Sequence, residues 1–216
     1  MTRDCTFPYA FIGWTTTGFP KCLMFYEVKK YIDGRFQLLP DSLKDHIRRT
    51  RNLGIEFSSQ FNVDPELVDI SILGHDIARN LDDISLINEA RNLGIAIGKI
   101  EKAVPILLHG PIAATWISNR FSDQIDERIL EAIYFHTTGK PYMSDVGKIT
   151  FLSDKLDPLK IERRPSLLQV KSNIDFGLDQ AILKFIELQI NYSHSNNWSI
   201  PNMLLDFRDS LTSKNT

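Results

Sequence analysis

Residues 64–76, DPELVDISILGHD, show the helical pattern that most of the chain repeats, and they end on two candidate site residues. Asp64 followed by Pro65 predicts the start of a helix, because Asp is a favoured N-cap and Pro is tolerated at the first helical position. Apolar residues then recur at helical spacing, at Leu67, Val68, Ile72 and Leu73. The predicted helix is therefore buried on one side, and it ends on the polar pair His75 and Asp76.

The same pattern extends outward to most of the chain. Leu43, Ile47, Leu53 and Phe57 keep a spacing of three to four residues through 42–61. Further helices are predicted to begin at Asp83, Asp126, Ser144, near Asp179 and at Pro201, and Gly94 is the predicted stop of the helix from Asp83. No alternating strand pattern and no Asn-Gly hairpin signal occurs after the first residues. We therefore predict an all-α fold.

Length and composition limit the class of protein. The 216 residues fit one domain, and 43% apolar residues with 24% charged residues are typical of a globular protein. A net charge of −2 argues against a nucleic-acid partner, and no apolar run is long enough to span a membrane. Cys5 and Cys22 form no CxxC pattern, and no signal peptide is recognised. We expect a cytoplasmic protein without a nucleic-acid or membrane partner; a homodimer is left open.

Residues 1–23 differ from the rest, since they are aromatic-rich, contain several Gly and Pro residues and lack a helical period. We interpret them as an N-terminal arm followed by one domain over 24–216. The arm is either a packing or interface segment, or a disordered or artefactual extension ahead of a true start at Met24.

Ligand-type side chains recur where apolar ones would be expected. They are His46, His75, Asp76, His109, His136 and Asp154. Any one of them could be an ordinary core residue, but together they need something that offsets their desolvation, which a divalent cation does. Imidazole and carboxylate without thiolate suit iron, manganese, zinc or cobalt. Residue His194, by contrast, is predicted to be solvated in a polar loop.

Adjacent residues on a helix point about 100° apart. His75 and Asp76 can therefore share a metal only at a helix end or distortion, which Gly74 makes easier.

These residues resemble the metal signature of the HD superfamily of phosphohydrolases, in the order His46, His75-Asp76, Asp154. Longer strings are similar to the YqeK-type family of symmetrical bis(5′-nucleosyl)-tetraphosphatases. They are SILGHDIAR (71–79), LLHGPIAA (107–114), AIYFHTTGKPYMSDVGKITFLSDKLDP (132–158) and INYSHSNNWSIP (190–201). The likeness extends from about residue 40 to 212. It implies an HD-domain helical bundle with the metal site in its core.

The resemblance also implies a ligand set and a reaction. His46, His75, Asp76 and Asp154 would hold one divalent metal, and Asp76 would bridge to a second metal held by His109 and His136. Iron is favoured, with manganese, cobalt and zinc as alternatives. The implied reaction is cleavage of diadenosine tetraphosphate, a small nucleotide substrate, into two ADP by a metal-activated hydroxide at a dinuclear centre.

The predicted catalytic residues are Asp76 and Arg79. Arg79 stands where this family usually has Lys, and it would stabilise charge that develops on the transferring phosphoryl group. Further substrate contacts are expected from residues next to the ligands, namely Thr137, Thr138, Gly139, Lys140 and Lys155. Thr137–Gly139 also fits an ordinary helix C-terminal turn. The Arg that the family usually has after the Pro is absent, which leaves Lys160, Arg163 or Arg164 to replace it after Pro158.

Two other functions stay open. One is a different HD-type phosphohydrolase, either a nucleotidase or a cyclic-dinucleotide phosphodiesterase. The other is a non-catalytic module that senses nucleotides, although such a module would be expected to have lost ligands. Trp116 and Tyr134 could stack on a base, but their helical spacing favours core packing.

Overall fold

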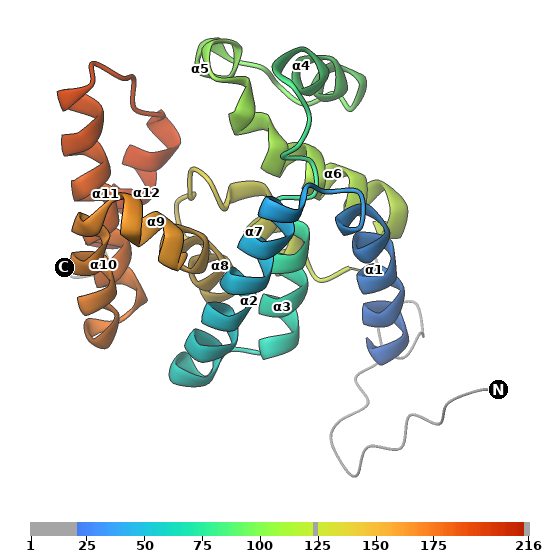
Figure 1. Cartoon of the computed structure of the whole chain (residues 1–216), viewed down its shortest axis with the longest axis horizontal. Coiled ribbons are helices and arrows are strands. Elements are labelled where there is room, and N and C mark those ends of the chain that lie inside the picture. Colours follow the sequence, from blue (N-terminus) through green and yellow to red (C-terminus); the bar gives the residue numbers. More distant parts are fainter. Residues whose placement is uncertain (1–20, 123–124, 214–216) are drawn as a thin grey trace.

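The computed structural model describes residues 21–122 and 125–213, and within them every regular element is a helix (Figure 1). The all-α prediction is confirmed. The α-helices are α1 (Lys21–Phe36), α2 (Asp41–Phe61), α3 (Pro65–Gly74), α4 (Asp83–Asn92), α5 (Lys99–Ala103), α6 (His109–Phe121), α7 (Glu127–Phe135), α8 (Asp145–Lys155), α9 (Pro158–Arg163), α10 (Leu168–Ser172), α11 (Leu178–Ser195) and α12 (Asn202–Thr212). Short 3-10 turns are η1 (Pro105–Leu108), η3 (Pro165–Leu167) and η4 (Ile174–Phe176).

The predicted capping residues begin their helices as expected. The Asp64 carboxylate accepts a hydrogen bond from the Glu66 amide at 3.0 Å and starts α3. In the same way Asp126 caps α7 and Ser144 caps α8. The left-handed Gly94 follows the end of α4, as predicted. These local signals define the ends between which the site residues lie.

Five helices form the centre of the molecule. Helix α3 packs against α2, α7 and α8, and α6 packs against α7. Helix α8 is covered on all sides, since residues 146–154 are buried without interruption. A helix that is buried all round usually lacks ionic groups. The buried Asp154 near the end of α8 therefore requires a compensating partner.

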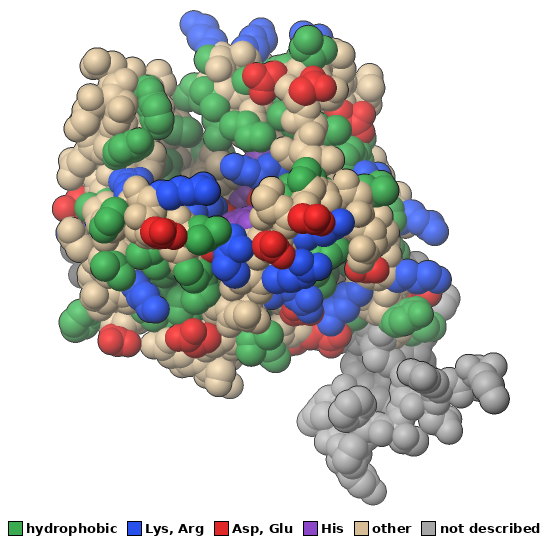
Figure 2. Space-filling view, in the orientation of Figure 1, with side chains coloured by type: hydrophobic (Ala, Val, Ile, Leu, Met, Phe, Trp, Pro, Cys, Tyr) green, Lys and Arg blue, Asp and Glu red, His purple; other side chains and the backbone are tan. Residues whose placement is uncertain are grey.

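The helices around this centre leave one face hollowed. In Figure 1, α4 and α5 lie on one side of the opening, and α11 and α12 lie on the other. Figure 2 shows histidine side chains at the bottom of this hollow, with Lys and Arg side chains around it. The hollow gives a small solute access to the otherwise buried histidines.

The predicted arm of residues 1–23 lies outside the described residues except for its last three positions, where α1 begins at Lys21. Trp116 belongs to a structural network: its indole N–H donates to Glu89 at 2.6 Å, and the Arg35 guanidinium stacks on its ring at 3.7 Å. Tyr134 packs against Phe135 with ring centroids 4.5 Å apart. The packing interpretation of both aromatic residues agrees with these contacts.

One local prediction is wrong. His194 is exposed as expected, but it lies in the last turn of α11 rather than in a loop. Helix α11 continues through this polar segment because Ser193, one residue earlier, is buried and Ser195 bonds back to the Asn191 carbonyl at 3.0 Å. In the described part of the chain, no helix has the length and apolar character needed to cross a bilayer.

Candidate metal centre

His75 and Asp76 lie immediately beyond the end of α3. The helix ends at Gly74, His75 is its C-cap, and a series of turns follows. Leaving the regular helix at this point lets both side chains face the same volume: His75 Nε2 lies 3.4 Å from Asp76 Oδ2. This is the helix-end arrangement that the sequence required if the two residues were to act together.

His109 and His136 meet because one helix begins where another ends. His109 is the first residue of α6, and His136 follows the last residue of α7. A Cβ atom at Gly110 would lie 2.9 Å from the Ile133 carbonyl oxygen and 3.1 Å from the His136 ring. Glycine therefore permits the close approach that leaves the two Nε2 atoms 2.8 Å apart.

His46 and Asp154 reach the cluster from two further helices. His46 lies one turn into α2, and Asp154 lies near the end of α8. His46 Nε2 lies 3.0 Å from Asp154 Oδ1, and His75 Nε2 lies 3.9 Å from the same oxygen. All the predicted ligands are buried, with at most 7% of each residue exposed.

Asp76 lies between two groups of histidines. Its Oδ1 atom is 3.0 Å from His109 Nε2 and 3.6 Å from His136 Nε2. Its Oδ2 atom is 3.6 Å from His46 Nε2 and 3.4 Å from His75 Nε2. Two sets with metal-ligand geometry result, one of His46, His75 and Asp76 and one of Asp76, His109 and His136. Asp154 lies beside the first set.

All four imidazoles turn the same ring nitrogen inward. Nδ1 of three of them lies within hydrogen-bond distance of the backbone carbonyl three residues earlier. These pairs are His75 with Ile72, His109 with Ile106, and His136 with Ile133. An Nδ1–H donated to a carbonyl places the Nε2 lone pair toward the centre. His46 differs, because its Nδ1 faces a carboxylate, that of Asp157 at 2.6 Å.

The protonation states of the cluster suit a cation. Burial lowers the pKa of His136 to about 3, assisted by the neighbouring His109 and His75, so its imidazole is neutral at physiological pH. Burial opposes ionisation of Asp76, but the surrounding His75, His109 and His136 hold its pKa well below the usual range. His136 and Asp76 thus combine a neutral imidazole with an ionised carboxylate, a donor pair typical of divalent metal sites.

Unsatisfied atoms in this cluster support the same conclusion. In the described part of the chain, the buried Nε2 atoms of His46 and His75 and Oδ1 of Asp76 have no hydrogen-bond partner. Each such atom costs about 1–3 kcal/mol unless something binds it. Metal ions at the two groups would satisfy them. The residues present therefore fit the metal that the sequence predicted.

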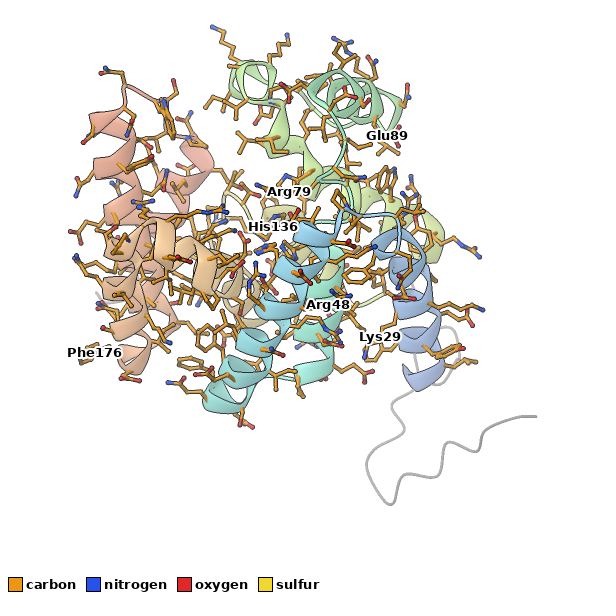
Figure 3. All side chains as sticks on the ribbon, viewed as in Figure 1. Lys29, Arg48, Arg79, Glu89, His136 and Phe176 are labelled. Atoms are coloured by element: carbon orange, nitrogen blue, oxygen red, sulfur yellow. The ribbon has the colours of Figure 1, made fainter. Side chains whose placement is uncertain are left out.

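Cationic side chains surround the cluster. Arg79 Nε lies 3.7 Å from Asp76 Oδ2, and its Nη1 lies 3.4 Å from His109 Nε2. Figure 3 shows Arg79 next to His136 at the hollow, whereas Glu89 lies apart on α4. Lys155 Nζ is 2.7 Å from Asp154 Oδ2, and Lys160 contacts the other oxygen of that carboxylate. Burial raises the pKa of Asp154, but these two lysines hold it well below its usual range.

The structure also resolves which cation after Pro158 lies at the site. Lys160 contacts Asp154. Arg164 turns away, donating to the Leu188 carbonyl at 2.7 Å and to Gln189 at 2.8 Å, and Arg163 is exposed.

The substrate contacts that were predicted on the loop after α7 do not all lie at the cluster. Thr137 Oγ1 lies 3.1 Å from His136 Nε2, so it is at the cluster. Thr138 donates to the Gly139 carbonyl at 3.0 Å, and Lys140 pairs with Glu131 at 2.9 Å. Gly139 has φ of +67° and closes a turn onto the Phe135 carbonyl, as the helix C-terminal interpretation predicts. A Cβ atom at position 139 would collide with the ring of Phe207.

Sequence reasoning did not identify Asp157, Arg49 and Gly110 as site residues. Asp157 precedes Pro158, and Asp-Pro is an ordinary helix-start signal, which hides a second role. Arg49 follows His46 by three residues, so the two side chains lie on the same face of the helix. This spacing is the sequence signal that could have placed Arg49 near the site. Nothing local marks Gly110, because its neighbours come from α7.

An all-α fold with a buried His and Asp cluster, open to solvent through a hollow lined with cations, defines a metal-dependent phosphohydrolase. The chain belongs to the HD domain family, whose model matches residues 43–159 and therefore includes both His46 and Asp154.

Similar proteins agree with this assignment. A symmetrical bis(5′-nucleosyl)-tetraphosphatase of Halalkalibacterium halodurans is 28% identical over 172 residues, which cover 76% of this chain and 88% of the relative. Its Bacillus subtilis counterpart is 28% identical over 146 residues, or 66% of this chain and 74% of the relative. A crystal structure from Clostridium acetobutylicum, described as an HD superfamily hydrolase involved in NAD metabolism, superposes with a TM-score of 0.76 at 26% identity, covering 86% of this chain and 97% of that one.

Proposed function

We propose that this HD-domain hydrolase cleaves bis(5′-nucleosyl) tetraphosphates symmetrically, so that diadenosine tetraphosphate gives two ADP. The observation that supports this most is the position of Asp76, whose two oxygens face two separate groups of histidines. The names of the curated relatives support the same substrate class. A dinuclear centre suits the hydrolysis of a phosphoanhydride bond.

His46, His75, Asp76 and Asp154 would hold one ion, and Asp76, His109 and His136 would hold the second. When bound, two divalent cations would supply a nucleophile from water at neutral pH and compensate charge on the phosphoryl oxygens. Iron is our preferred metal, with manganese, cobalt and zinc as alternatives.

The chain's own cations would bind the polyphosphate. Arg79 stands on the Asp76 and His109 side of the cluster with 41% of its side chain exposed. Lys160 stands on the Asp154 side with 36% of its side chain exposed. Cations on both sides of the centre would hold phosphate groups on both sides of the bond that breaks, as central cleavage of a tetraphosphate requires.

Other predicted contacts take different roles in this proposal. Thr137 would donate its hydroxyl to a phosphate oxygen beside His136. Lys155 is largely buried, donates to the His136 carbonyl at 3.1 Å and would act mainly on Asp154. Thr138, Gly139 and Lys140 stay predictions, and Lys140 would have to leave Glu131 to reach a phosphate.

Product analysis tests the proposal. The protein is purified, its metal content is measured by elemental analysis, and it is incubated with diadenosine tetraphosphate in the presence of iron(II), manganese or cobalt. We expect ADP as the single nucleotide product. Formation of AMP with ATP contradicts symmetrical cleavage. Preferential hydrolysis of mononucleotides or of a cyclic dinucleotide indicates a different HD-type phosphohydrolase, and absence of turnover in protein that contains metal favours a sensing module.

A further inference from the structure

We infer that Asp157, clamped by Arg49, is a positioning residue for His46 and so for the ion at the His46, His75 and Asp76 group. The inference rests on the proposed metal centre. It concerns a carboxylate that contacts no reacting atom, and acts through the histidine in front of it.

Both oxygens of the Asp157 carboxylate have hydrogen-bond partners. Its Oδ1 accepts from Arg49 Nε at 2.7 Å and from the Leu159 amide at 3.1 Å. Its Oδ2 accepts from Arg49 Nη2 at 2.9 Å and faces His46 Nδ1 at 2.6 Å. The residue is only 2% exposed. Two fixed donors on Oδ1 and one on Oδ2 hold the carboxylate plane, so the remaining lone pair is directed at the imidazole.

This support is different from that of the other three imidazoles. Those rings face carbonyls of the turn that carries them, so each is held within its own segment. His46 instead depends on a residue 111 positions away. Its ring lies on α2 and its partner lies at the N-cap of α9, so the contact also fixes these two helices relative to each other.

Replacing Asp157 by Asn gives a sharp test because the shape is kept. Arg49 Nε and the Leu159 amide would retain the amide oxygen at the Oδ1 position, since both are donors. The amide NH₂ group would then replace Oδ2, so Arg49 Nη2 loses its acceptor, while His46 Nδ1 must act as an acceptor and the ring proton moves to Nε2. A protonated Nε2 cannot bind a metal. Asn is also a good N-cap, so α9 should still begin correctly.

The experiment is a titration of the metal-free protein with cobalt(II), in which calorimetry measures the affinity and stoichiometry of binding. Elemental analysis of the washed protein then gives the amount of cobalt that stays bound. We expect two equivalents per chain in the wild type. In Asp157→Asn, affinity for one equivalent should fall about 10–100-fold, the usual effect of losing an outer partner of a ligating histidine, while the other equivalent is kept.

Asp179→Asn is the matched control. Asp179 forms an ion pair with the buried Lys148 of α8 at 2.5 Å, which lies outside the cluster. This variant should bind both equivalents as the wild type does, and an equal loss of affinity in it would overturn the inference in favour of a general structural effect.

Two further outcomes separate the inference from the proposed function. Wild-type protein that binds no cobalt contradicts the metal centre itself. Wild-type protein that binds two equivalents, with Asp157→Asn binding both equally well, overturns only the role of Asp157. Should Asp157→Asn fail to fold, Arg49→Gln removes the clamp and leaves the His46 contact. It should weaken one equivalent several-fold, and unchanged binding would also overturn the inference.

Discussion

Oδ1 of Asp76 lies 3.0 Å from Nε2 of His109, and the second oxygen of this carboxylate faces the opposite pair of histidines. One side chain therefore belongs to both groups that could hold a metal. Asp76 can face both groups because it lies just beyond the end of α3, which packs against α2, α7 and α8.

In the proposed dinuclear centre, removal of the Asp76 carboxylate should affect the binding of both ions. We expect Asp76→Asn to lower the bound metal content and to reduce kcat by at least about 100-fold, more than the ~10–100-fold effect typical of outer partners. Steady-state hydrolysis of diadenosine tetraphosphate and elemental analysis provide the measurements. The double variant His75→Ala with Asp76→Ala should be inactive. Near wild-type turnover in metal-free protein of that variant would contradict the metal mechanism.

Arg79 should act on the transition state more than on metal binding. Arg79→Ala is expected to lower kcat/KM by about 10²–10³-fold, the range for loss of one preorganised donor. Arg79→Lys should recover part of this, because it keeps the charge but cannot donate in a bidentate way. Metal content should stay unchanged in both. A normal kcat/KM in Arg79→Ala would remove this residue from the proposed mechanism.

Lys160 offers a way to test the second cation. Its ammonium contacts Asp154, whereas Arg163 three residues later is exposed. Loss of a charge-assisted hydrogen bond should raise the KM for diadenosine tetraphosphate at least about tenfold in Lys160→Ala. Metal affinity should be unchanged or higher, because Asp154 loses a competing cation. Arg163→Ala is the control, and an equal effect in both variants would indicate non-specific charge attraction.

Gly110 should be required for the second group of ligands. A Cβ atom there would meet the Ile133 carbonyl oxygen at 2.9 Å, so Gly110→Ala should separate α6 from α7. We expect a loss of about 1–3 kcal/mol in the free energy of unfolding, together with weaker binding of one metal equivalent. Gly34→Ala in α1, where nothing lies within 4 Å, should stabilise the protein by about 0.5–1 kcal/mol. Urea denaturation measures both, and a neutral Gly110→Ala would contradict the packing argument.

Glu131 should make stability depend on acid pH. Burial raises its pKa, but hydrogen bonds from Ser144 and Lys140 outweigh burial and lower it. A lowered folded-state pKa means that the contribution is complete above the unfolded-state pKa, near 4.5, and is lost as the pH falls through the folded-state value.

The matching variant is Glu131→Gln, which cannot ionise. At pH 7 it should be about 1–2 kcal/mol less stable than the wild type, since charged hydrogen bonds to the loop before α8 are lost. The difference should shrink below about pH 5. Urea titrations at pH 7 and pH 4 provide the comparison, and a difference that grows on acidification has the wrong sign for this account.

Much of the helical fold follows from local chemistry. The helix starts at Asp64, Asp126 and Ser144 could be predicted from the sequence, because an N-cap side chain accepts a hydrogen bond from an amide only two or three residues away. The extent of α11 past His194 was missed, since the burial of Ser193 depends on contacts that its own polar neighbours do not reveal.

The amino-acid sequence shows which residue types are available for the site: imidazoles and carboxylates at the ends of apolar helical segments, with no thiolate among them. How these side chains combine depends on the packing of the helices. That packing places the two oxygens of Asp76 against different histidine pairs, brings Lys160 rather than Arg164 to the site and joins Asp157 to His46 across 111 residues. Capping and periodicity act within a few residues, whereas the geometry of the candidate site depends on contacts between helices that are far apart in the sequence.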